Sequence, residues 1–96
     1  MKTTVVNIKT HNYDEYIGRP SPLGNRYRIG VDGTREECIE RYSRDFNASE
    51  RLKKIARDTC IDKVIGCYCK PFACHGDIIA EYLNGLKKDE KRTASS

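Results

Sequence analysis

The chain has 96 residues, of which 38% are hydrophobic and 33% are charged, and its formal net charge is +4 at pH 7. This size suits one small domain with a modest core. No hydrophobic run is long enough to cross a membrane, and the first residues lack the apolar segment of a signal peptide, so we expect a cytoplasmic protein. The small positive charge permits binding of nucleotides or nucleic acids but demands neither.

The chain contains five cysteines, which is an odd number. Disulfides rarely persist in a reducing compartment, and an odd set cannot form a complete disulfide framework. We therefore expect no disulfide that the fold requires. Free thiols, a metal site and reactive cysteines remain as alternatives.

Two stretches predict the main β-strands. Residues 3–8 are short and rich in β-branched side chains, and residues 64–69 form a second apolar run. Tyr16 and Ile17 predict a brief additional strand. Residues 28–31 predict a short edge strand that ends at the turn dipeptide Asp32-Gly33.

Three helices are expected. Thr34 and Glu37 have the spacing of a capping box at the start of the first helix, and Ser49 can cap the second. In the second helix the basic side chains Lys53, Lys54 and Arg57 would point outward. The apolar stripes are Cys38, Ile39, Tyr42 and Phe46 in the first helix, Leu52, Ile55 and Ala56 in the second, and Ile78, Ile79, Tyr82, Leu83 and Leu86 in the third.

This order of elements predicts a small single α/β domain with a short, mainly parallel sheet flanked by about three helices, because helices separate the two best strands. The domain would cover residues 1–88, and residues 89–96, which lack an apolar stripe, would form a disordered tail. Ligands of such sheets bind beyond the carboxyl ends of the strands. The segments that follow the first and last strands would then share one edge.

The loop at residues 18–28 contains two prolines, two glycines and three arginines but no acidic residue. Gly18 and Gly24 would let the backbone approach a ligand closely. Arg19 and Arg26 would bind a phosphate or carboxylate, and Asn25 would form a hydrogen bond with the ligand. An ordinary surface loop with solvated arginines is the alternative.

Three cysteines and a histidine lie between the last strand and the last helix: Cys67, Cys69, Cys74 and His75. Side chains alternate along a strand, so the first two would point to the same face. Cys74, His75 and Gly76 would lie at the start of the helix, where unpaired backbone N–H groups and the helix dipole stabilise a thiolate or a bound phosphate.

Three interpretations of this group stay open. The four side chains supply the ligands of a zinc site, although adjacent Cys-His rarely ligates one ion. Cys74 could be a nucleophile with His75 or His11 as its base, although adjacent residues seldom face each other on a helix. The third interpretation is structural, with small thiols packed in a tight turn. Zinc is the one cofactor that these residues suggest, and none is certain.

Residues 18–25 (GRPSPLGN) and 66–77 (GCYCKPFACHGD) resemble an uncharacterised family of small phage and bacterial proteins that is known only as a domain of unknown function. The resemblance covers roughly residues 4–86. Many relatives read Gly-Asn-Pro-Phe where this chain has Gly24-Asn25-Arg26-Tyr27, so we expect the turn after Asn25 to differ here. The resemblance implies a phage-type protein, with the host cytoplasm as its location, and two paired motifs, but no reaction.

The sequence therefore predicts a domain that binds a phosphate-bearing small molecule, a nucleotide or nucleotide derivative, through Gly18, Arg19, Gly24, Asn25, Arg26, Cys74, His75 and Gly76. The alternative is an interaction protein that inhibits a host or defence enzyme, with the cysteines and histidine shaping the fold or binding zinc. A cleft lined by Arg19 and His75 would favour the first function, and a flat apolar patch the second. Nucleic acid is not the favoured partner, and the sequence does not indicate whether a reaction is catalysed.

Overall fold

The computed structural model describes residues 2–70 and 72–95, with side chains described as far as Leu86. The described residues form the strands β1 (Thr4–Asn7), β2 (Glu15–Tyr16) and β3 (Val64–Cys67) and the helices α1 (Arg35–Ala48), α2 (Glu50–Cys60) and α3 (Gly76–Ser95). The three strands form one sheet. The predicted α/β class is confirmed.

The sheet is entirely parallel, with the strand order β1-β3-β2. Val5 lies opposite Ile65 in the register of β1 and β3, which confirms the predicted parallel pairing of the two main strands. The brief strand expected at Tyr16 and Ile17 is present one residue earlier, as β2. All three strands therefore present their carboxyl ends at the same edge.

The edge strand predicted for residues 28–31 is wrong. The chain turns there instead, because the N–H groups of Val31 and Asp32 both donate to the carbonyl of Arg28. Gly30 has φ of 87°, a conformation that favours glycine, and only an isolated bridge joins Ile29 to Gly33.

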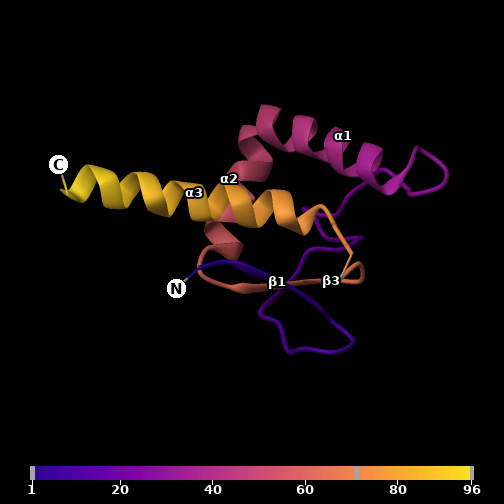
Figure 1. The fold of residues 1–96 in the computed structure, drawn as a ribbon, viewed down its shortest axis with the longest axis horizontal. Helices are drawn as coiled ribbons and strands as arrows, with labels where there is room; N and C mark the ends of the chain where they lie inside the picture. The colour runs from indigo at the N-terminus through magenta and orange to yellow at the C-terminus, as the bar shows by residue number, and fades with distance from the viewer. Residues whose placement is uncertain (1, 71, 96) are drawn as a thin grey trace.

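The helices lie on one side of the sheet, and the segment that connects β1 to β2 lies on the other side (Figure 1). This segment packs so closely on the central strand that a side chain at residue 66 would displace it. A Cβ atom on Gly66 would lie 2.5 Å from Cγ2 of Ile8 and 2.9 Å from Cγ of Tyr13. The sequence Ile65-Gly66-Cys67 thus lets a loop cover the face of β3 that the helices leave open.

The core lies between the sheet and the helices. Phe46, Ile65, Ile79 and Leu83 are fully buried there. The apolar side chains of Val5, Val6, Ile8 and Val64 are only half-buried. For Val5, Val6 and Ile8 the reason is that β1 is an edge strand, with no neighbouring strand on its outer side. The buried side chains of Ile17 and Leu23, in the segment that follows β2, complete the core.

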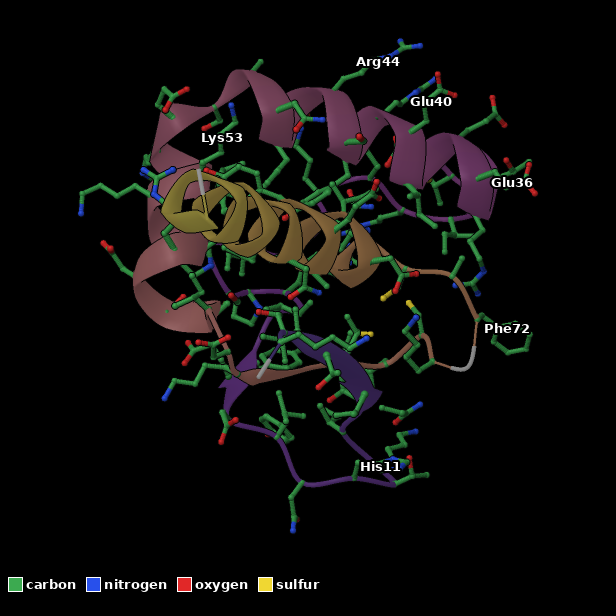
Figure 2. The ribbon with its side chains drawn as sticks, turned by 60° about the vertical axis from the view of Figure 1, so that its left-hand side comes forward. His11, Glu36, Glu40, Arg44, Lys53 and Phe72 are labelled. Atoms are coloured by element: carbon green, nitrogen blue, oxygen red, sulfur yellow. The ribbon has the colours of Figure 1, made fainter. Side chains whose placement is uncertain are left out.

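The helix caps follow the predicted pattern. Thr34 and Glu37 form a reciprocal capping box on α1, and the Ser49 hydroxyl accepts the N–H of Leu52 at the start of α2. Lys53 does not point fully outward as expected, because only 20% of its side chain is exposed and its Nζ lies over the ring of Tyr82. Figure 2 shows Lys53 beside α3, whereas Glu36, Glu40 and Arg44 lie on the opposite, outer side of α1.

The last helix extends through residues 89–95, the segment for which we expected a disordered tail. Figure 1 shows this end of α3 reaching beyond the sheet. Lysine, glutamate, arginine and alanine have high intrinsic helix propensity, which explains a helical backbone without an apolar stripe. Residue 96 lies outside the described residues. No helix in the described part of the chain is long and apolar enough to cross a membrane.

Candidate functional site

A cavity of about 570 Å³ lies at the carboxyl ends of β2 and β3. Its walls come from two segments that are far apart in the sequence, residues 16–31 and residues 67–75, and from the first turns of α1. The parallel topology brings these segments to one edge, as the sequence predicted. Five of the predicted ligand-binding residues line this cavity: Gly18, Arg19, Asn25, Cys74 and His75.

Three arginines line the cavity, Arg19, Arg28 and Arg35, and none of its described lining residues is acidic. Among the described residues, none of these arginines forms an ion pair. Arg35 donates from Nη1 to the carbonyl of Ala73 at 3.1 Å and stacks over Phe72 at 5.2 Å. It therefore ties α1 to the turn before α3 while its charge stays at the cavity. The result is an electropositive site.

Aromatic side chains form another part of the wall. Tyr16, Tyr27 and Tyr68 all line the cavity. The rings of Tyr16 and Tyr68 pack edge to face with their centroids 6.0 Å apart, and the hydroxyl of Tyr27 donates to Asp45 at 2.7 Å. Such surfaces can stack on a flat, apolar ligand group.

The two glycines of the loop are explained by contacts within the protein. A Cβ atom on Gly18 would collide with the ring and hydroxyl of Tyr16, and that hydroxyl donates to the carbonyl of Arg19 at 2.9 Å. A Cβ atom on Gly24 would lie 3.0 Å from the backbone nitrogen of Arg19. Both glycines let the loop fold tightly on itself, and Gly24 does not line the cavity.

The next two residues of the loop have separate roles. Asn25 donates from Nδ2 to the carbonyl of Cys38 at 3.3 Å, and its Oδ1 accepts the N–H of Tyr27 at 3.0 Å, so its amide anchors the loop to α1. Arg26 lies at a second, shallower hollow of about 470 Å³, which Gly24 also lines. There it forms an ion pair with Asp45 at 3.1 Å. The structure does not bring Gly24 and Arg26 to the main cavity.

His75 connects the two walls. Its Nε2 is 2.7 Å from the carbonyl oxygen of Ile17, so Nε2 carries the proton and donates this bond. Burial lowers the pKa of His75, and the charge of Arg19 lowers it further, although the bond to Ile17 opposes this shift. The ring also packs edge to face on Tyr42 at 5.0 Å. His75 is therefore a neutral positioning group at neutral pH.

The start of α3 differs from the expected phosphate site. The N–H of Cys74 donates to Oδ2 of Asp77 at 3.2 Å, and Oδ1 of Asp77 lies 2.5 Å from Nζ of Lys70. The N–H of Asp77 bonds to the carbonyl of Cys74. A Cβ atom on Gly76 would meet Ile17 and Val5. The N–H groups at the start of α3 are thus bonded within the chain, and the positive charge of the cavity comes from its arginines.

Two of the cysteines meet in the cavity wall, where Sγ of Cys67 lies 3.1 Å from Sγ of Cys74. The hydrogen bond with Cys74 lowers the pKa of Cys67, and the backbone N–H groups of Cys69 and Lys70 add to this effect against the cost of burial. The pKa of Cys74 is raised, chiefly by the same bond and by burial. A thiolate of this pair is therefore favoured at Cys67 rather than at Cys74, the position that the helix start suggested.

The other chemical interpretations receive no geometric support. Among the described residues, no group of three or more His, Cys, Asp or Glu side chains is arranged to hold a metal ion. His75 directs Nε2 at Ile17 rather than at the sulfurs. His11 lies on the loop across the sheet from the helices (Figure 2), where its Nδ1 is 2.8 Å from the hydroxyl of Thr10. It is not a base for Cys74.

Residues 2–85 match the model of a protein family described as a domain of unknown function (DUF4326). The chain belongs to this family. It is 39% identical over 90 residues to a protein of Enterobacteria phage T4 described as "Uncharacterized 12.4 kDa protein in nrdA-td intergenic region", and the match covers 90% of this chain and 82% of that protein. No solved structure matches the chain significantly.

Several lining residues of this DUF4326 domain were not identified from its sequence. Arg28 lies in the segment predicted as an edge strand, and Arg35 lies in the first turn of a helix. Tyr16 and Tyr68 lie at the ends of strands. The topology offered a signal for the tyrosines, because both come at carboxyl ends of parallel strands. Arg28 belongs to the arginine-containing loop but was not named as a ligand-binding residue, and no signal indicated Arg35 at the start of α1.

Proposed function

We propose that this DUF4326 domain binds a phosphate-bearing small molecule, a nucleotide or nucleotide derivative, in the cavity at the carboxyl ends of β2 and β3. The supporting observation is that Arg19, Arg28 and Arg35 line one cavity together with tyrosines and without an acidic side chain among the described lining residues. The proposal includes a cytoplasmic location, in the host if the protein is encoded by a phage.

The volume and the chemistry of the wall suit such a ligand. A cavity of about 570 Å³ is within the range of small-molecule sites. Guanidinium groups offer paired donors to phosphate oxygens, and the faces of Tyr16 and Tyr68 offer stacking surfaces for a base. Since N–H groups at the start of α3 are bonded within the chain, the arginines would supply the charge that binds phosphate.

Substitution of Arg19 tests the proposal most directly. It is exposed, and no structural bond of its side chain is found among the described residues, so the fold should survive its removal. We expect Arg19→Ala to weaken nucleotide binding by about 1.5–3 kcal/mol, the usual scale for a charge-assisted hydrogen bond. Arg28→Ala should act in the same direction.

The chain offers a matched control. Arg44 on α1 is paired with Glu40 and lines neither hollow, so Arg44→Ala should leave affinity unchanged. Calorimetric titration with ATP, GTP, AMP, adenosine and inorganic phosphate would compare the three variants with the unmodified protein. Binding that requires a phosphate group and fails only in the cavity variants supports the proposal. If no compound of this panel binds the unmodified protein, the ligand hypothesis fails.

A second candidate function is favoured by one observation. Large apolar side chains are exposed around the cavity, including Val31 at 77% and Phe72 at 64%, and Figure 2 shows Phe72 at the outer edge of its turn. Such residues are typical of a surface that contacts another protein. This second function is an interaction protein that inhibits a host or defence enzyme. Substitution of both residues by Asp should then abolish co-purification of the partner, whereas Arg26→Ala should retain it.

A further inference from the structure

The close approach of Cys67 and Cys74 has no role in the proposed ligand binding. Their sulfur atoms are 3.1 Å apart, and one cysteine ends β3 while the other precedes α3. A disulfide bond is about 2.05 Å long, so the sulfurs would need to move together by about 1 Å. The connecting residues 68–75 contain no helix or strand among those described and can absorb such a movement.

The two thiols are chemically different. Cys67 shares a hydrogen bond with the thiol of Cys74, and the backbone N–H groups of Cys69 and Lys70 stabilise its thiolate. Cys74 keeps its proton, because the neighbouring thiolate and its burial oppose ionisation. A thiolate beside a protonated thiol is the arrangement of an attacking cysteine and a resolving cysteine.

Access to the pair is restricted to small reagents. Cys67 is 1% exposed and Cys74 is 2% exposed, but both line the cavity, so a small molecule that enters it can reach them. The remaining cysteines lack this arrangement. Cys38 donates weakly to the carbonyl of Gly33, and Cys60 lies beside the hydroxyl of Thr59.

We propose that Cys67 and Cys74 form a redox-active dithiol that a small hydroperoxide oxidises to an intramolecular disulfide. The Cys67 thiolate attacks one peroxide oxygen, the O–O bond breaks, and the leaving oxygen takes up a proton, which leaves Cys67 as a sulfenic acid. The Cys74 thiol then loses its proton and attacks the Cys67 sulfur, and the sulfenic oxygen leaves as water. Two thiols are oxidised by two electrons while the peroxide is reduced, and a small dithiol reverses the change.

The first experiment needs only the unmodified protein. The reduced chain is treated with stoichiometric hydrogen peroxide, free thiols are alkylated, and the product is digested with chymotrypsin, which cleaves after aromatic residues. Cleavage after Tyr68 and Phe72 places Cys67, Cys69 and Cys74 on three different peptides. We expect a cross-linked pair that joins the peptides of Cys67 and Cys74, about 2 mass units lighter than the two reduced peptides together, and its disappearance after treatment with dithiothreitol.

Serine variants provide the matched comparison. Cys69→Ser should still lose two alkylatable thiols on oxidation, because Cys69 lines the same cavity but is not a member of the pair. Cys67→Ser and Cys74→Ser should not form the cross-link, with circular dichroism confirming that each variant is folded. A cross-link through Cys69, or full alkylation of all five cysteines after peroxide treatment, would overturn the proposal.

Discussion

His75 donates a hydrogen bond from Nε2 to the carbonyl oxygen of Ile17 at 2.7 Å, across 58 positions of the sequence. This bond joins the arginine-containing loop to the turn that carries Cys74, and it therefore holds the two walls of the cavity together. The neutral imidazole suffices for the bond, and burial makes the charged form unfavourable. The integrity of the cavity is thereby linked to pH.

The first prediction concerns this linkage. The pKa of His75 is lowered from its ordinary value of 6.5 in the folded protein, so below that pH the unfolded chain binds more protons than the folded one. Stability should consequently fall as the pH decreases from 7 towards 5, by at most about 1.4 kcal/mol per pH unit from this residue. Urea unfolding at several pH values measures the slope.

A variant separates His75 from other titrating groups. Glutamine places an amide N–H donor close to the position of Nε2 but does not titrate. His75→Gln should keep much of the stability at pH 7 and lose the decrease between pH 7 and 5. An unchanged slope in this variant would show that other groups cause the pH dependence.

The second prediction compares two glycines. Gly66→Ala should destabilise the fold by about 1–3 kcal/mol, because its Cβ would press on Ile8 and Tyr13 beneath the central strand. Gly85→Ala is the control, since its Cβ would meet no atom within 4 Å and alanine favours a helix by about 1 kcal/mol relative to glycine. Chemical denaturation of both variants should give shifts of opposite sign, and equal shifts would contradict this account of β3.

The third prediction concerns the core under α3. Leu83 is fully buried against the sheet, whereas Leu86, one turn later on the same stripe, is half-buried. Leu83→Ala should reduce the free energy of unfolding by about 2–5 kcal/mol, as large-to-small changes in packed cores do. Leu86→Ala should cost clearly less. A similar loss for both variants in urea titrations would mean that burial along α3 is more uniform than the structure shows.

Much of the fold could be predicted because it depends on local patterns. The β-branched run around Val5, the apolar run around Ile65 and the capping box at Thr34 each specify an element, and helices between two strands favour a parallel sheet. The shared edge follows from this topology alone. For that reason the sequence placed Arg19 and His75 at one cavity before their contacts were known.

The details of the site depend on the path of two irregular loops, which periodicity does not describe. The sequence did not show that the carboxylate of Asp77 would accept the N–H of Cys74. This bond depends on the path of the turn before α3. It did not distinguish Cys67 from Cys74 as the thiolate for the same reason. The position of Arg28 depends on the turn at residues 28–32, and neither Arg28 nor Arg35 was named as a site residue.

The last prediction connects the thiol pair with ligand binding and depends on both proposals. The Cys67 thiolate adds a negative charge to a cavity whose other charges are the arginines, and oxidation to the disulfide removes it. The oxidised protein should therefore bind phosphate-bearing ligands more tightly, by about 1 kcal/mol if the charges are near 4 Å apart in water. Calorimetry of ATP and inorganic phosphate on both redox forms measures this difference.

Two comparisons identify the cause of such a change. Reduced Cys67→Ser lacks the thiolate and should bind as tightly as the oxidised protein, whereas reduced Cys69→Ser should behave like the unmodified reduced protein. Because the effect is electrostatic, the difference between the redox forms should shrink as salt shortens the screening length. Equal affinity of the two forms at low salt would mean that phosphate binds away from Cys67. Tighter binding to the reduced form would indicate that the thiolate itself contacts the ligand, and the charge argument would then have the wrong sign.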